Sequence, residues 1–327
     1  GQARGHRLGL LPPPLGQVQP RRPAGQHPAG GGGLPVADEH HDGGARGVVV
    51  AHAPHATRGA GSAHQVGRDA FPSPGERSSV DGVTERPDIH TLGELRAAGS
   101  EHRPLRLEIR ENLLSALAEG RDPWPGLHGL ADTVLPQLER ALLAGHDVVL
   151  LGERGQGKTR LLRTLAGLLD EWSPEVQGSE LHEHPEDPLT EAVRERIAIE
   201  GDDLPIAWRH REERYVEKLA TPDTSVADLI GDVDPIRVAE GRRLGDPETI
   251  HYGLIPRAHR GIVAVNELPD LAERIQVSML NVMEERDVQI RGYVLRLPLD
   301  VLVVASANPE DYTNRGRIIT PLKDRFG

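Results

Sequence analysis

Apolar residues follow two spacings between residues 91 and 306, and these spacings predict helices and strands in turn. Apolar side chains at helical spacing predict helices over 91–99, 105–120, 131–143, 160–169, 191–200 and 269–285. Short continuous apolar runs predict buried strands over 146–151, 261–267 and 300–306, and alternation around Arg291-Gly292 predicts a β-hairpin over 288–297. In the helix over 105–120, the expected buried stripe is Leu107, Ile109, Leu113, Leu114 and Leu117. We expect an α/β fold built on a parallel sheet.

The most informative stretch, residues 152–159, lies between the predicted strand 146–151 and the helix that follows it. It matches the pattern G-x-x-x-x-G-K-[ST], in which glycines let backbone N–H groups turn toward a phosphate at a helix N-terminus. In such a site Lys158 neutralises the β- and γ-phosphates, and the Thr159 hydroxyl ligates Mg²⁺. A chance match in a Gly-rich turn is the competing explanation, and both flanks disfavour it. The candidate nucleotide-binding residues are Gly152, Glu153, Arg154, Gly155, Gln156, Gly157, Lys158, Thr159 and Arg160.

Two predicted strands in the second half of the chain end in polar side chains. The strand over 261–267 ends in Asn266 and Glu267, and the strand over 300–306 is followed by Asn308. Because the carboxyl end of a parallel strand faces the ligand, Glu267 is placed to polarise a water for attack on a γ-phosphate. Asn308 is expected beside Glu267, where it orients the water or senses the phosphate. Arginines that could reach a phosphate follow at positions 315, 317 and 325.

Composition narrows the classes of function. The chain has no cysteine, which excludes disulfides and thiolate metal sites and indicates a reducing, cytoplasmic compartment. No apolar run approaches the ~20 residues of a membrane span, and no signal peptide opens the sequence. The net charge of -12 argues against a general nucleic-acid-binding surface.

Residues 1–82 differ from the rest of the chain. They hold 17 of the 37 glycines and show no sustained apolar periodicity, so the sequence predicts disorder there. The first methionine is Met279, and the stretch beginning at Val83 resembles an ordinary N-terminus. Our hypothesis is that residues 1–82 are a non-native segment, upstream DNA translated in the wrong frame or an artefact. The His40-His41 pair lacks a second ligand cluster, so metal binding is disfavoured.

Two further stretches have open interpretations. The turn-rich connector over 121–126, just before the phosphate-loop strand, could wrap an adenine, while Trp124 is expected to be core packing. Residues 171–260 are either a surface loop or, as their length favours, an inserted element. Within them His182 and His184 could suggest a metal loop, but a His-x-His pair without partners is more often solvated surface.

Residues 91–327 resemble AAA+ ATPases, specifically the group of the magnesium-chelatase ATPase subunit and the MoxR-like ATPases. The resemblance rests on four stretches, residues 152–159, 259–268, 306–310 and 321–327. It implies a three-layer P-loop core with a helix-2 insert over 228–258, a hairpin over 288–297, and ATP and Mg²⁺ as ligands. It also implies a Walker A loop over 152–159, a Walker B strand ending at Glu267, a sensor-1 residue at Asn308 and an arginine finger at Arg325. The family further implies a homo-oligomeric ring, expected as a hexamer, and a partner with a von Willebrand factor A domain.

The resemblance divides the chain into a helical entry over 83–130 and a nucleotide-binding core over 131–327. Two departures limit it. The Walker B position that usually holds Asp is Asn266, which keeps an acceptor oxygen but loses the charge, so Mg²⁺ contact through water is expected to be weaker. The sequence also stops at Gly327, before a helical lid and its sensor-2 arginine, and is expected to be truncated there.

Three functions are compatible with these features. The favoured one is an ATP-hydrolysing motor that remodels a partner protein. A nucleic-acid-directed motor or transcription activator is a second, against which the acidic balance of residues 83–327 counts. A nucleotide-gated scaffold that does not hydrolyse ATP is a third, motivated by Asn266 and the missing lid. A shared fold alone does not decide among them.

Overall fold

The computed structural model describes residues 85–326, with gaps at 235, 237–238, 241–248, 286, 291–292 and 309–316. All of the described residues belong to the same compact unit of the chain. The expectations for residues 1–82, for Arg315 and for the turn of the hairpin over 288–297 lie outside the described residues. No helix in the described ranges is long and apolar enough to cross a membrane.

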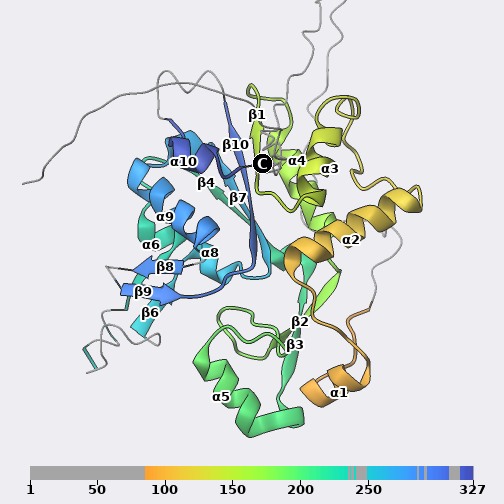
Figure 1. Ribbon diagram of the computed structural model, residues 1–327, viewed down its shortest axis with the longest axis vertical. Helices are drawn as coiled ribbons and strands as arrows, with labels where there is room; N and C mark the ends of the chain where they lie inside the picture. The colour runs from red at the N-terminus through yellow and green to blue at the C-terminus, as the bar shows by residue number, and fades with distance from the viewer. Residues whose placement is uncertain are drawn as a thin grey trace, which may run out of the picture. The chain divides into compact units, whose positions relative to one another are not determined.

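A four-stranded parallel sheet forms the centre of the described fold (Figure 1). Its strands lie in the order β1 (Val148–Leu151), β10 (Val301–Ala307), β7 (Gly261–Asn266) and β4 (Tyr215–Leu219). The register pairs Leu151 with Ala307, Ala305 with Val265, and Leu219 with Asn266. The carboxyl ends of all four strands therefore lie along one edge of the sheet.

Helices cover both faces of this sheet, which confirms the predicted three-layer α/β fold (Figure 1). Alternate residues of each strand point to opposite faces, so the sheet contributes to two separate apolar cores. One core contains the inward faces of α2 (Leu105–Ala118), α3 (Leu135–Leu143), α4 (Lys158–Thr164) and the 3-10 helix η1 (Leu165–Leu168). The other contains those of α6 (Val226–Leu229), α8 (Leu254–Arg257), the 3-10 helix η5 (Leu268–Asp270), α9 (Glu273–Glu284) and α10 (Thr320–Lys323).

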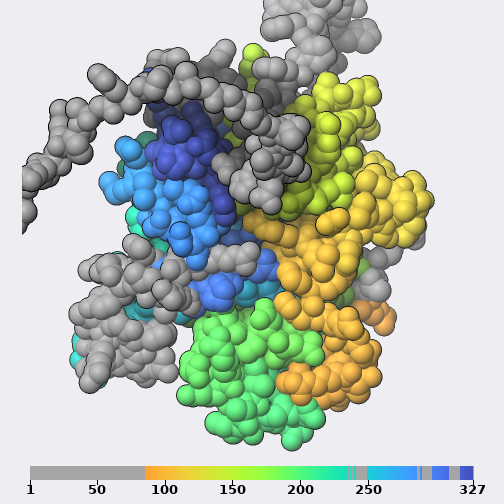
Figure 2. All heavy atoms as spheres, in the orientation of Figure 1, coloured from red at the N-terminus to blue at the C-terminus, as the bar shows by residue number. Residues whose placement is uncertain are grey.

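The stretch over 171–260 is more structured than a surface loop, and its middle third contains a strand of the central sheet. That strand, β4, is short, polar and only half-buried, so its apolar pattern is too weak to predict it. The remainder includes an antiparallel ladder of β2 (Trp172–Val176) and β3 (Ile206–His210), helix α5 (Glu191–Glu200) and the 3-10 helices η2 (Gly201–Asp203) and η3 (Arg211–Arg214). Strands β2 and β3 and helix α5 share a third apolar core with α1 (Leu92–Ala97), and Figure 2 shows α1 in orange against the green segment.

Two hairpins occupy the positions that the family resemblance implies for insertions. The first pairs β5 (Gly231–Val233) with β6 (Ile250–Tyr252), inside the stretch over 228–258. The second pairs β8 (Asp287–Ile290) with β9 (Tyr293–Arg296), between α9 and β10. Strands β5 and β8 are in contact, so the two hairpins lie side by side.

Several predicted helices differ in detail from those observed. The helix predicted over 160–169 continues only to Thr164 as an α-helix, α3 begins at Leu135 rather than residue 131, and α9 begins at Glu273 after the 3-10 turn η5. The predicted stripe of α2 is partly wrong, because Leu107, Leu114 and Leu117 are exposed. The face that α2 buries instead carries Leu105, Glu108, Ile109, Leu113 and Ala116.

Candidate nucleotide site

The loop over 152–159 joins the carboxyl end of β1 to the first turn of α4, as its sequence predicts. Gly155 and Gly157 have φ angles of +82° and +77°, a left-handed conformation that side chains with a Cβ rarely adopt. Gly157 is the residue that caps α4 at its N-terminus. Glu153 and Arg154 are exposed at the loop, while Lys158 is buried. The backbone thus forms the turn that an anion-binding loop requires.

The ammonium of Lys158 lies inside this loop. Its Nζ donates to the main-chain oxygens of Gly152 and Glu153 at 2.5 and 2.8 Å. The loop also holds a buried side-chain oxygen, Oε1 of Gln156, for which no hydrogen-bond partner is present among the described residues. The loop therefore contains a buried oxygen that lacks a donor in the described part of the chain, on Gln156, and an ammonium beside two exposed glycines, on Lys158. Both groups fit a loop that binds the phosphates and the cation of a nucleotide.

A cavity of about 470 Å³ adjoins the loop on the side of the connector. Gly155, Gln156, Gly157 and Arg160 line it from the loop, and residues 126–130 line it as well. Of the connector over 121–126, Gly126 alone lines this cavity, so contact between the connector and a nucleotide base stays a prediction. Trp124 is buried and donates from Nε1 to Glu139 at 2.8 Å, so it packs in the core beside the cavity rather than lining it.

The carboxyl ends of β7 and β10 bring a second group of polar side chains to the same edge. Ser306 links them, because its Oγ donates to Oδ1 of Asn266 at 3.1 Å and accepts the backbone N–H of Glu267 at 3.2 Å. Glu267 has a φ of +56°, unusual for a residue with a side chain, and it is half-buried. Such backbone strain persists only where the surroundings hold it, and it clusters at functional positions.

Asn308 is buried directly after β10. The N–H of Gly152 donates to the main-chain oxygen of Ala307 at 3.2 Å, so the start of the phosphate loop touches the residue before Asn308. The phosphate loop, the end of β7 with Glu267 and the end of β10 with Asn308 therefore lie along one edge of the sheet, as the sequence predicts.

Arg325 lies at the opposite edge. Its side chain is exposed and donates from Nη2 to the main-chain oxygen of Met283 at 3.0 Å. It lines a cavity of about 430 Å³ with Asp147 and Asp300, which immediately precede β1 and β10. Within one chain Arg325 is therefore at the amino ends of the strands whose carboxyl ends carry the nucleotide loop.

The sequence analysis did not identify two of the polar residues at the site. Ser306 is one, and Glu217 of β4 is the other. Glu217 accepts from Nδ2 of Asn266 at 2.7 Å and from Nε and Nη2 of Arg163 at 2.8 and 3.1 Å. These hydrogen bonds, together with the charge of Glu217, raise the pKa of Arg163. Glu217 could have been placed here if the sequence had shown that β4 pairs with β7.

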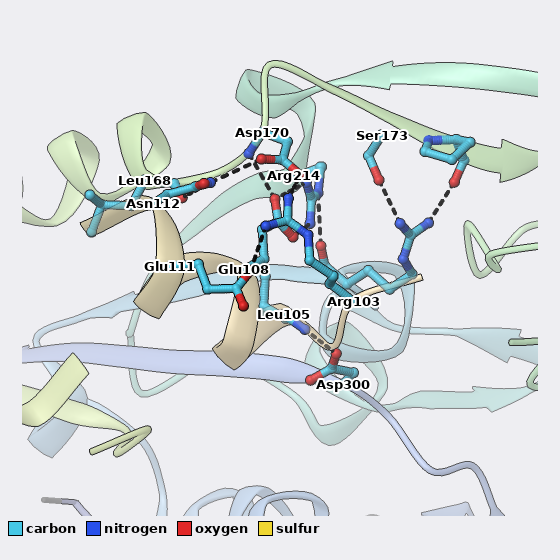
Figure 3. A network of polar contacts seen from close by, with 12 residues as sticks. Arg103, Leu105, Glu108, Glu111, Asn112, Leu168, Asp170, Ser173, Arg214 and Asp300 are labelled. Carbon is cyan, nitrogen blue, oxygen red and sulfur yellow. Dashed lines mark hydrogen bonds and ion pairs between the residues drawn. The ribbon is translucent and has the colours of Figure 1, made fainter. Parts of the chain in front are cut away.

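A buried ionic network ties the amino ends of the strands together (Figure 3). Glu108 of α2 accepts from both terminal nitrogens of Arg214 at 2.7 Å, and both side chains are almost completely buried. The N–H of Asp170 donates to the same carboxylate at 2.7 Å. Arg260 donates to Ser173 and Pro174 of β2 and is also buried. The network holds α2, β2 and the start of β4 together at the amino ends of the strands, opposite the ends that carry the nucleotide loop.

Comparison with known proteins agrees with this geometry. Over 185 residues, 55% of this chain, the sequence is 30% identical to a magnesium-chelatase subunit ChlI of Anabaena variabilis and covers 50% of that protein. It is 31% identical to a magnesium-chelatase 38 kDa subunit of Acidiphilium rubrum, of which it covers 49%. A family model described as the Sigma-54 interaction domain matches residues 244–322. Over these matched residues the chain is similar to magnesium-chelatase subunits and to a Sigma-54 interaction domain.

The chain spans about half the length of the curated relatives it matches. A structure of the complex between subunits BchI and BchD of magnesium chelatase, based on a cryo-EM reconstruction, is 24% identical. The likeness has a TM-score of 0.42 and covers 59% of this chain and 55% of that one. The magnesium-chelatase relatives imply a nucleotide and Mg²⁺, and the loop, the adjoining cavity and the Thr159 hydroxyl fit these ligands.

Proposed function

We propose that this protein is an ATP-hydrolysing AAA+ motor subunit that remodels a partner protein. The observation that carries the proposal is the convergence of the loop over 152–159, the pair Asn266–Glu267 and Asn308 at one edge of the sheet. Among these, the loop supplies a cradle for phosphates, Glu267 supplies a base, and Asn308 supplies an amide beside them. Related folds with such a set move phosphoryl groups to water.

Each side chain has a distinct part in this proposal. Lys158 binds the β- and γ-phosphates, and the strained turn at Glu267 directs its carboxylate to orient and polarise the attacking water. Asn308 contacts the γ-phosphate or that water. Thr159, and Asn266 through water, would hold Mg²⁺, which neutralises charge on the phosphate oxygens when bound.

Arg325 is proposed to act on the nucleotide of a neighbouring subunit. Its position at the amino ends of β1 and β10 puts it out of reach of the loop in its own chain, while leaving its side chain exposed. A closed ring of identical subunits, with six as the expected number, would bring it to a neighbour's site. An arginine in that position contributes about 10³–10⁵-fold to turnover in other nucleotide hydrolases.

Partner and client are part of the same proposal. The relatives are magnesium-chelatase subunits, and a neighbouring structure is a complex of subunits BchI and BchD, so a multi-subunit assembly is the expected setting. We infer a partner with a von Willebrand factor A domain and a motor or chaperone role akin to MoxR-like ATPases. Residues 83–130 serve as the helical entry and 131–327 as the nucleotide-binding core of this subunit.

The test is ATPase activity per subunit of the full chain as protein concentration rises. Turnover should rise steeply with concentration, vanish in Lys158→Ala and Glu267→Gln, and fall at least about 10³-fold in Arg325→Ala. Glu267→Gln should still bind ATP, because its carboxylate acts on water rather than on the phosphates. Arg194→Ala, on the exposed face of α5, is the control and should behave as the unsubstituted chain.

A mixing experiment decides whether Arg325 acts between subunits. Mixed rings of Lys158→Ala and Arg325→Ala subunits place an intact arginine beside an intact loop, so part of the turnover should return. No recovery in rings shown to be mixed would refute an arginine acting in trans. ATP binding without turnover at any concentration would instead favour a nucleotide-gated scaffold.

A transcription activator is the second candidate, because the Sigma-54 interaction domain matches residues 244–322. That match covers β7, α9, the hairpin of β8 and β9, and β10, and it leaves out the loop over 152–159. Turnover stimulated by a σ factor, and unaffected by a von Willebrand factor A protein, would favour this candidate over the motor.

A further inference from the structure

The carboxamide of Asn266 has both of its ends occupied by hydrogen bonds. Nδ2 donates to Oε1 of Glu217 at 2.7 Å, and Oδ1 accepts from Oγ of Ser306 at 3.1 Å. The reverse orientation would set an amide oxygen against a carboxylate oxygen, so only one orientation satisfies the group. Glu217 therefore fixes which way the oxygen of Asn266 points.

Glu217 reaches Asn266 because of the register of β4 and β7. Glu217 pairs with Ala264, two residues before Asn266 and on the same face of the sheet. Ala264 belongs to the core under α4, so this face looks toward the helix that begins with Lys158. The small side chain of Ala264 leaves room for the carboxylate of Glu217 beside Asn266.

Arg163 connects the same carboxylate to the nucleotide loop. It lies four residues after Thr159 on α4, and residues at that spacing share one helix face. Its Nε and Nη2 donate to the two oxygens of Glu217, whose side chain is 23% exposed. Glu217 is thus held between the loop helix on one side and the Walker B position on the other.

We propose that Glu217 is the acidic group of this metal site, carrying on β4 the negative charge that position 266 lacks. It acts as a positioning residue: it orients the oxygen of Asn266 toward the water shell of Mg²⁺ and keeps one carboxylate charge beside it. An aspartate at position 266 would face Glu217 at the same separation, and two carboxylates that close cannot both ionise. Asn266 and Glu217 therefore form a matched pair with a single charge. This inference rests on the proposed function.

A four-member series tests the pairing: the unsubstituted chain, Glu217→Gln, Asn266→Asp and the double variant. The first measurement is the midpoint of thermal unfolding without nucleotide. At pH 8 Asn266→Asp should melt roughly 4–10 °C below the double variant, because only the single variant confronts two carboxylates.

The second measurement is the Mg²⁺ concentration that half-saturates binding of a fluorescent ATP analogue. Glu217→Gln should raise that concentration about tenfold, as loss of a residue that orients a metal ligand commonly does. The double variant should recover most of the loss, because it restores one carboxylate. Glu213→Gln, an exposed acid just before β4, is the matched control and should change nothing.

Two results would overturn the pairing. One is an unchanged Mg²⁺ requirement in Glu217→Gln, and the other is an Asn266→Asp chain that melts as high as the double variant. Failure of the unsubstituted chain to bind the analogue at any Mg²⁺ concentration would refute the proposed function and the metal role together. The unfolding series needs no nucleotide, so it would still report separately whether the two positions share one charge.

Discussion

The buried pair of Glu108 and Arg214 gives a prediction whose size follows from the structure. Glu108 is 4% exposed and Arg214 2%, and two hydrogen bonds of 2.7 Å join them (Figure 3). Arg214→Leu would leave the carboxylate of Glu108 in the interior with the N–H of Asp170 as its remaining hydrogen-bond partner and with Arg103 and Arg260 as more distant charges. Breaking a buried pair from one side costs about 3–5 kcal/mol, since the remaining charge is neither solvated nor paired.

For a domain of this size each kcal/mol corresponds to about 2–4 °C in unfolding temperature, so a drop of roughly 6–20 °C is expected. The assays are thermal unfolding of the full chain, for the temperature, and urea unfolding, for the free energy, both followed by circular dichroism. Glu108→Leu should cost a similar amount, but the double variant should cost at least about 2 kcal/mol less than the two single losses added together. The unpaired charge is what makes each single change expensive, and the double variant has none.

The control is an ion pair of the same chemistry in solvent. Glu191 pairs with Arg194 at 3.1 Å on α5, with side chains 75% and 48% exposed, so Glu191→Leu should cost less than about 1 kcal/mol. If Arg214→Leu were as mild as this control, burial would not be what makes the pair important. Strict additivity in the double variant would likewise refute the reasoning.

Two further predictions concern stability. Burial lowers the pKa of His184 to about 2 and that of His259 to about 3, so both stay neutral when folded while the unfolded chain takes up protons near pH 6.5. The unfolded state then binds more protons, and urea unfolding should show a loss of about 2–3 kcal/mol between pH 7.5 and 5.5, reduced by half in His259→Gln. The added methyl group in Gly261→Ala would overlap the main-chain oxygen of Arg214, at a cost of at least about 1–3 kcal/mol in the free energy of unfolding. The control is Gly167→Ala, whose methyl group meets no atom within 4 Å and which should be neutral in the same assay.

Local patterns allowed much of the fold to be predicted. Strands β7 and β10 are buried on both faces, so each appears in the sequence as a continuous apolar run. The turn between β1 and α4 could be predicted because its glycines and Lys158 are adjacent in sequence. Helix α5 was predicted with the bounds that it has, since Thr190 caps its first turn.

Long-range pairing explains what could not be predicted. Helix α2 buries Glu108 and exposes Leu107, Leu114 and Leu117. A buried carboxylate is tolerable there because Arg214, 106 residues away in the sequence, supplies its partner. No spacing within α2 carries that information. Strand β2 contains Pro174 and pairs only with β3, as suits a residue that cannot donate a ladder hydrogen bond.

Strand β4 was not predicted, and for the same reason the negative charge of Glu217 beside Asn266 was not predicted either. Without β4, Asn266 is an amide where an acid is expected, and the sequence indicates a weakened metal site. With β4 beside β7, the carboxylate of Glu217 lies 2.7 Å from that amide, and Arg163 holds it from the loop helix. An edge strand with half-exposed polar residues is hard to predict, yet such a strand can carry charge to the end of its buried neighbour. Under the proposed pairing, position 266 is therefore better judged together with Glu217, as a pair of residues on two strands, than as a single substitution.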